Sequence, residues 1–207
     1  KENRSTVMLA IDTSKSMEKT DVTPSRLQAG VDAAERFLEA APKDAAVGLV
    51  TFDAGARVRV APTTDRNAVR DALKNLPIGV GTAIGDAVQA SLQSIQASGA
   101  LAQVPERAQT SAARILLLGL APADHDGLAA VLGEGPVAIL SRGFGNCRIT
   151  ATRARGVWRV RYFNSMNTMI LDTIEVVDFP ESARAGAEDY DDSVERLQDL
   201  LRWLLEG

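Results

Sequence analysis

Three short apolar segments constrain the fold of this chain more than any other feature of its sequence. They are Val7–Ile11, Val47–Phe52 and Ile115–Leu118. Apolar runs of this length without polar alternation are typical of strands that helices cover on both faces, as in a parallel sheet. Stretches with a helical apolar stripe lie between these runs. They cover residues 25–41, 67–76 and 82–98.

The order of these segments predicts the fold class of the first half. The predicted order is strand, helix, strand, edge strand, helices and strand. The edge strand is predicted at residues 57–60, where polar and apolar residues alternate. Thr23 and Pro24 are predicted to cap and open the first helix. Residues 100–113 are predicted to form a loop. We therefore expect an α/β domain with a doubly wound, mostly parallel sheet.

The second half has a different pattern. After Gly119 the sequence predicts a short helix over 124–132, and alternating residues such as those around Trp158 predict strands. The predicted strands and the last helix cover 137–141, 148–163 with a turn near Arg155, 168–177 and 193–205. The last helix has a stripe of leucines, which are Leu197, Leu200, Leu201 and Leu204. We expect a small α+β antiparallel meander with a C-terminal helix, and domains at 1–120 and 121–207.

The composition excludes several classes of protein. A chain of 207 residues is long enough to bury a core without staples. Its single cysteine, Cys147, allows no intrachain disulfide, and with the single His125 it excludes a four-ligand Cys/His zinc site. The net charge of −4 argues against a general nucleic-acid binder. No apolar run is long enough to span a membrane.

Asp12, Ser14 and Ser16 follow the first apolar run directly, in the pattern Asp-x-Ser-x-Ser. The carboxyl ends of the strands open onto the ligand crevice of an α/β sheet, so one carboxylate and two hydroxyls are expected around one point there. Thr82, after Gly81, supplies a further hydroxyl at the start of a later helix. Hard oxygen ligands of this kind suit Mg²⁺. The alternative is that these residues only cap and hydrogen-bond a loop.

The segments Met8–Met17 and Gly81–Gly85, which carry these residues, resemble a von Willebrand factor A domain of the bacterial aerotolerance type. The resemblance covers about residues 5–118, without the family's last strands and helices. It implies a metal-ion-dependent adhesion site that binds Mg²⁺ or Mn²⁺. The matching positions are Asp12, Ser14, Ser16 and Thr82. It also implies a protein partner that completes the metal shell with its own carboxylate.

One position departs from the pattern of that family. In the family the fourth strand runs into Ser/Thr-Asp-Gly, and this Asp belongs to the metal site. Here Leu118 is followed by Gly119-Leu120-Ala121, with no acid. Asp124, Asp126 or Asp53 could replace the missing carboxylate, and their spacing does not choose between them.

The second half resembles the conserved C-terminal region of nickel-iron hydrogenase expression proteins of the HupH type. The resemblance is carried by Gly135–Thr150, Val157–Met166 and Ile170–Val176, and it covers about residues 122–205. It implies a cytoplasmic accessory role in hydrogenase assembly, with no established catalysis. Two partial family regions that meet near Leu118 suggest a fusion or a chimera. For the location, the alternative to the cytoplasm is a membrane-anchored parent protein of the first half.

The second half offers few other candidates for function. Arg159 and Arg161 share one strand face, which is either a solvated face or a docking patch for an acidic partner. Cys147 is either a small buried residue or a reactive thiol that contacts a partner. His125, near a helix start, is expected at the surface.

The sequence thus predicts a protein-binding assembly factor, without enzyme activity, for nickel-iron hydrogenase maturation. Its expected partner is a hydrogenase subunit or another accessory protein, bound through a magnesium site. One alternative is a metal-free scaffold with a degenerate A-type domain. Another is a metal-dependent hydrolase, which would need a general base beside the metal, and no histidine neighbours Asp12.

Overall fold

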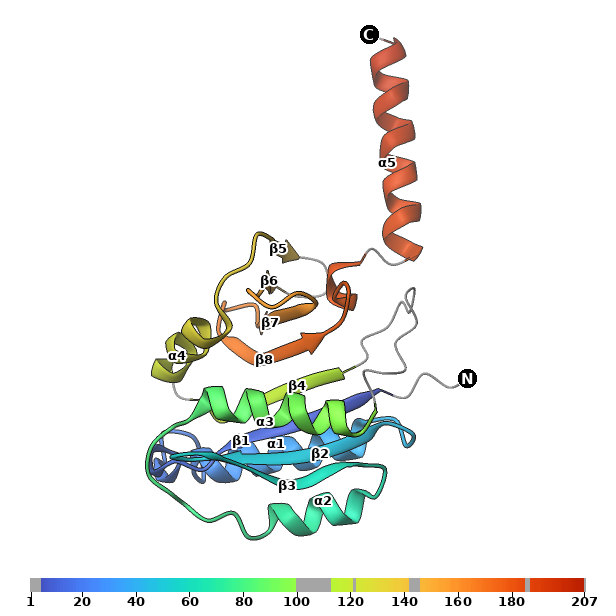
Figure 1. Cartoon of the computed structure of the whole chain (residues 1–207). Coiled ribbons are helices and arrows are strands. Elements are labelled where there is room, and N and C mark those ends of the chain that lie inside the picture. The colour runs from blue at the N-terminus through green and yellow to red at the C-terminus, as the bar shows by residue number, and fades with distance from the viewer. Residues whose placement is uncertain (1–4, 100–112, 121, 142–145, 185–186, 207) are drawn as a thin grey trace.

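A single eight-stranded sheet organises the computed structural model of this chain (Figure 1). The structure describes residues 5–99, 113–120, 122–141, 146–184 and 187–206. The strands are β1 (Thr6–Asp12), β2 (Ala46–Phe52), β3 (Ala56–Thr63), β4 (Ala113–Leu118), β5 (Ala138–Ser141), β6 (Asn146–Ala151), β7 (Val157–Phe163) and β8 (Met169–Val176). The helices are η1 (Lys15–Glu18), α1 (Arg26–Ala40), α2 (Arg66–Leu73), α3 (Ile84–Ala97), α4 (Pro122–Leu132), η3 (Glu181–Ala183) and α5 (Ala187–Glu206). The strand order is β3-β2-β1-β4-β8-β7-β6-β5.

The predicted parallel core is confirmed. The central strand β1 pairs in parallel with β2 on one side and with β4 on the other, while β3 adds an antiparallel edge to β2. All seven residues of β1 are buried, as expected for a strand covered on both faces. The α/β class predicted from the three apolar runs is therefore the observed one.

Successive residues of β1 belong to two different hydrophobic clusters. Met8 and Ala10 pack with residues of α3, whereas Leu9 and Ile11 pack with α1 and α2. Because side chains alternate along a strand, α3 covers one face of the sheet and α1 and α2 cover the other. The carboxyl end of β1, with Asp12, emerges at the edge between these layers.

The antiparallel meander continues the same sheet. Strand β4 pairs antiparallel with β8, where Ile115 lies opposite Ile174 and Leu117 opposite Asp172. Strands β7, β6 and β5 then add one after another, each antiparallel to its neighbour. The domain boundary near residue 120 stays a prediction, but the sheet runs across it.

Some predicted boundaries differ from the structure. Ser25, and not Thr23, caps α1, because the Ser25 hydroxyl accepts the backbone N–H of Gln28. Helix α5 begins at Ala187, six residues before the predicted start at Ser193. Residues 100–112 of the predicted loop lie outside the described residues, as do the side chains of Leu200 and Leu204.

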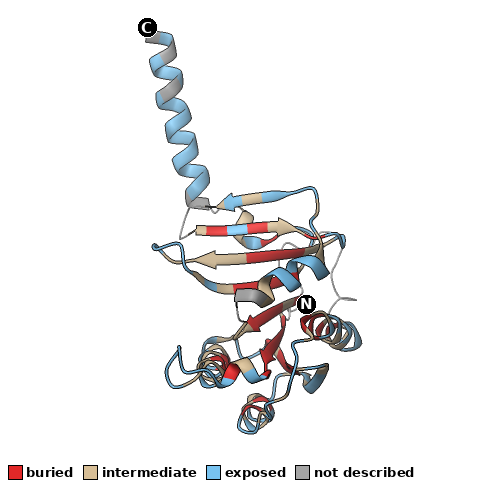
Figure 2. Cartoon of the chain, turned by 90° about the vertical axis from the view of Figure 1, so that its left-hand side faces the viewer, coloured by how far each residue is buried: buried red, intermediate tan, exposed pale blue. Residues whose placement is uncertain are grey.

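Helix α5 projects away from the sheet in both views of the chain (Figures 1 and 2). Its apolar side chains are exposed, with Leu197 at 58% and Leu201 at 57%. None of the described helices has the length and apolar character that a membrane span requires.

Candidate functional site

Asp12, the last residue of β1, is fully buried at the carboxyl edge of the sheet. Its Oδ1 accepts the backbone N–H of Ser14 at 2.7 Å. Its Oδ2 is buried and has no hydrogen-bond partner. An unsatisfied buried carboxylate oxygen costs free energy, so this atom is a candidate ligand for a cation.

The two serines of the motif lie next to each other. The Ser14 and Ser16 hydroxyl oxygens are 2.9 Å apart, and Ser14 is almost fully buried. The next residue, Met17 of η1, is fully buried and anchors the serine loop in the core. Gly119, just after β4, has φ of +79°, and a Cβ there would collide with the Met17 side chain. The end of β4 therefore approaches the serine loop closely.

The loop with Thr82 is tied to the same edge by backbone hydrogen bonds. Gly79 donates its N–H to the carbonyl of Thr13 at 2.8 Å, and Ala83 donates to the carbonyl of Asp53 at 2.6 Å. Thr82 itself is exposed between these two anchors. The structure thus brings the Thr82 loop beside the Asp12 loop but leaves the Thr82 side chain in solvent.

Two further carboxylates act on Asp12. Burial is the largest cause that raises the pKa of Asp12, and hydrogen bonds from Ser14 partly offset it. Repulsion by Asp124 and Asp53 raises the pKa further. Asp124 lies in the first turn of α4, and Asp53 forms an ion pair with Arg57 at 3.7 Å. Both therefore lie within electrostatic reach of Asp12, whereas Asp126 does not contribute.

The position that holds an acid in other A-type domains is filled by Leu120, which is partly buried against the core beneath α3. Within the described ranges, no three His, Cys, Asp or Glu side chains converge as a metal-binding group. The donors that do converge are one carboxylate and two hydroxyls. Such a set fits a Mg²⁺ ion that keeps several of its waters.

Arg159 belongs to a buried network on the face covered by α4. Its guanidinium donates to both carboxylate oxygens of Asp172, with the shortest contact at 2.6 Å. His125 of α4 adds an Nδ1 contact to Asp172 at 3.1 Å, and its carbonyl accepts from Arg159 at 3.3 Å. Burial alone would raise the pKa of Asp172, but the hydrogen bonds from His125 and Arg159 hold that pKa below its usual value.

The solvated face predicted for Arg159 is wrong, because only 6% of the residue is exposed. His125, predicted at the surface, is partly buried, with 21% of its side chain exposed. The helix α4 covers this face, which strand alternation alone does not reveal. Asp172 was not identified from the sequence as a member of this network. One feature could have indicated it, because Asp172 is an acid in the middle of the largely apolar strand β8.

The other two predicted contact residues behave differently. Cys147 is buried, as expected of a small core residue, and burial raises the pKa of its thiol. Arg161 is partly buried directly opposite Arg148 of β6, and its Nε has no hydrogen-bond partner. Burial and the neighbouring Arg159 and Arg148 lower the pKa of Arg161.

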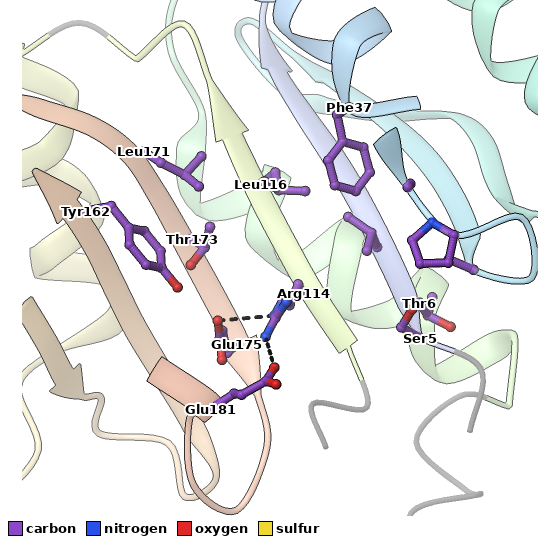
Figure 3. Close-up of a pocket in the computed structure, with 14 residues that line it drawn as sticks. Ser5, Thr6, Phe37, Arg114, Leu116, Tyr162, Leu171, Thr173, Glu175 and Glu181 are labelled. Atoms are coloured by element: carbon purple, nitrogen blue, oxygen red, sulfur yellow. Dashed lines mark hydrogen bonds and ion pairs between the residues drawn. The ribbon is translucent and has the colours of Figure 1, made fainter. Parts of the chain in front are cut away.

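A cavity of about 470 Å³ lies on the α1 face of the sheet, near the amino-terminal end of β1 (Figure 3). Its apolar wall includes Phe37 of α1 and Leu116 and Leu171 of the sheet. At its polar end Arg114 forms ion pairs with Glu175 at 3.1 Å and with Glu181 at 3.2 Å. Because Thr6, at the start of β1, lines it, the cavity is separate from the Asp12 site at the end of that strand.

The parallel core, with Asp-x-Ser-x-Ser at the carboxyl end of its central strand, defines the class of this protein as an A-type domain with an antiparallel extension. Comparison with known families agrees. Residues 7–118 match the von Willebrand factor type A domain, and residues 87–204 match the HupH hydrogenase expression protein, C-terminal conserved region. Each match covers more than half of the chain, and the chain therefore belongs to both families.

Individual relatives match part of the chain. The hydrogenase expression/formation protein HupQ of Azotobacter chroococcum mcd 1 is 55% identical over 84 residues, 41% of this chain and 30% of the relative. A UPF0353 protein of Nocardia farcinica (strain IFM 10152) is 42% identical over 117 residues, 56% of this chain and 34% of the relative. The chain spans about a third of the length of these relatives. The structure of hydrogenase expression protein HupH from Thiobacillus denitrificans ATCC 25259 is 29% identical, with a TM-score of 0.33, over 42% of this chain and 71% of that one.

Proposed function

We propose that this chain is a non-enzymatic, cytoplasmic protein-binding factor in the formation of a nickel-iron hydrogenase. In this proposal a divalent cation held at the carboxyl edge of the sheet captures a carboxylate of a protein partner. The names of the relatives of the second half support the hydrogenase role. The A-type half supports binding of a protein partner.

The observation that carries the proposal is the buried, unpartnered Oδ2 of Asp12. A cation beside this oxygen would satisfy it and would offset the repulsion from Asp53 and Asp124. The Ser14 and Ser16 hydroxyls would supply two further oxygen ligands on the same side. A bound Mg²⁺ would act as a positive anchor for a partner carboxylate, whereas the protein's own residues only hold and orient it.

The cation site is tested by titrating Mg²⁺ and Mn²⁺ into the protein in a calorimeter. We expect saturable binding that Asp12→Ala abolishes. Asp126→Ala is the matched control, because this exposed acid of α4 does not act on Asp12. Binding that survives Asp12→Ala would contradict the assignment of the site.

The partner is tested by retention of hydrogenase subunits on the immobilised chain. We expect retention with Mg²⁺ that is lost in chelator and in Asp12→Ala, and that is kept in Asp126→Ala. No retention of any subunit, with or without metal, would refute the hydrogenase role. Cell fractionation tests the cytoplasmic location.

A metal-free scaffold is the second candidate, and Leu120 favours it. This side chain packs against the core at the place where an acid would complete the metal site. The scaffold predicts no heat of binding for either cation and partner retention that Asp12→Ala leaves unchanged. The two measurements above therefore separate the candidates.

A further inference from the structure

Two surfaces of this chain are uncovered and complementary in charge. We propose that two copies of the chain exchange their α5 helices, so that each α5 lies on the arginine face of the other copy. The arginine face is defined by Leu140, Arg148, Arg161 and Phe163. It lies on β5, β6 and β7, the outer strands of the meander.

Strand register places the residues of the arginine face on one side of the sheet. Leu140 lies opposite Arg148, Arg148 opposite Arg161, and Arg161 opposite Asp172. Arg148 stacks on the Phe163 ring at 5.0 Å, which confirms that the two share this side. Leu140 is 53% exposed, and Phe163 is partly buried. Solvent therefore reaches an apolar side chain at the outer edge of the arginine face.

Two arginines dominate the charge of the arginine face, although Asp172 and Glu134 lie within electrostatic reach of Arg161. Like charges directly opposite on neighbouring strands repel, and Arg148 and Arg161 are such a pair. Asp172 attracts Arg161, but both of its carboxylate oxygens already accept hydrogen bonds from Arg159. The buried Nε of Arg161 also has no acceptor. An acidic ligand over this pair would relieve the repulsion and supply the acceptor.

Helix α5 has the matching chemistry. Its 20 residues include seven acids and two bases, which gives a formal charge of −5. Tyr190, Val194, Leu197 and Leu201 follow at spacings of four, three and four, so they form one apolar stripe, and all four are more than half exposed. Most helical stability in proteins comes from packing of an apolar face, so an exposed stripe of this kind favours docking of α5.

A second copy fits better than the same chain. In both views α5 points away from its own sheet (Figures 1 and 2). In a twofold dimer the same contact forms twice, so the buried apolar area doubles without any new surface. Asp191 lies about a quarter of the way round the helix from the stripe, and Glu195 follows one turn later on the same flank. On this flank they would reach Arg148 and Arg161 of the other copy.

The test is the mass of the full chain by sedimentation equilibrium over a wide range of concentration, in chelator so that it is independent of the metal site. We expect a dimer. Leu197→Glu/Leu201→Glu should give a monomer, and Trp203→Ser, on the opposite side of α5, should change nothing. Far-UV circular dichroism confirms that each variant is folded.

Exchanging the charges of Arg148 and of the two α5 acids tests whether α5 binds the arginine face. Arg148→Glu alone and Asp191→Arg/Glu195→Arg alone should each weaken the dimer by about tenfold or more, because attraction becomes repulsion at the contact. The triple variant should recover most of the affinity, which a folding defect would not allow. A monomer at every concentration overturns the proposal. So does a dimer that depends on the stripe but not on Arg148, since it would pair helix with helix.

Discussion

The buried pair Arg159–Asp172 should contribute measurably to stability. The two side chains are 7% and 3% exposed, and their shortest contact is 2.6 Å. Arg159→Met removes the guanidinium but keeps an apolar stem of similar length. It leaves the buried Asp172 carboxylate with the contact to His125 Nδ1 at 3.1 Å. Removing one partner of a buried ion pair costs about 3–5 kcal/mol. For a chain of this size that corresponds to a fall in Tm of roughly 6–20 °C.

The assay is equilibrium denaturation by urea at neutral pH. The double variant Arg159→Met/Asp172→Leu should recover most of the loss, because an apolar pair can replace a buried ion pair at little cost. Arg155→Met, at the exposed turn between β6 and β7, is the control and should stay within about 0.5 kcal/mol of the parent. If Arg159→Met costs less than about 1 kcal/mol, or if the double variant loses as much as the single variants together, the network is not the stabilising element inferred from its geometry.

Three further predictions concern the site and its pH dependence. Without metal, Asp12→Asn should raise Tm in a thermal-shift assay, because it removes a buried charge that two neighbours repel, and it should abolish the stabilisation by Mg²⁺ of about 2.7 kcal/mol at a hundredfold excess over Kd. An unchanged Tm would mean that Asp12 carries no electrostatic penalty. Leu120→Asp should tighten Mg²⁺ binding about tenfold or more in calorimetry, since it adds a carboxylate ligand, and no gain would mean that the loop after β4 is built differently. The lowered pKa of Asp172 contributes stability that is present above its unfolded value of about 3.9 and is lost as pH falls through the folded value, so Asp172→Asn should flatten the acid limb of a stability-versus-pH curve.

The local pattern of this sequence predicts most of its elements but not their long-range pairing. The apolar runs around Leu9, Leu49 and Leu116 identified the parallel core. A fully buried strand is recognisable from its own continuous apolar run, without knowing which strand it pairs with. The pairing of β4 with β8 was not predicted. Nothing in the alternation of either strand indicates that Ile115 lies opposite Ile174, since their contact is fixed by the whole sheet.

The candidate site shows the same division. The motif at Asp12 was found from sequence because its residues are neighbours in the chain. The approach of Asp124 and Asp53 to Asp12 could only be named as alternatives, because loops from three strand ends determine it. The face shared by Arg159 and Arg161 was predicted correctly, but the cover that α4 provides over Arg159 depends on a tertiary contact through His125.

The position of β4 in the sheet has a consequence for how this chain folds. This strand pairs with β1, about a hundred residues earlier, and with β8, about sixty residues later. Both pairings are of high contact order, so the sheet should close late and slowly compared with its helices. A nascent chain that ended after Leu118 would present β4 as an open apolar edge, which invites aggregation by strand addition. The HupH-type segment closes this edge once β8 pairs with β4, so the sheet of the A-type half is complete only with the second half.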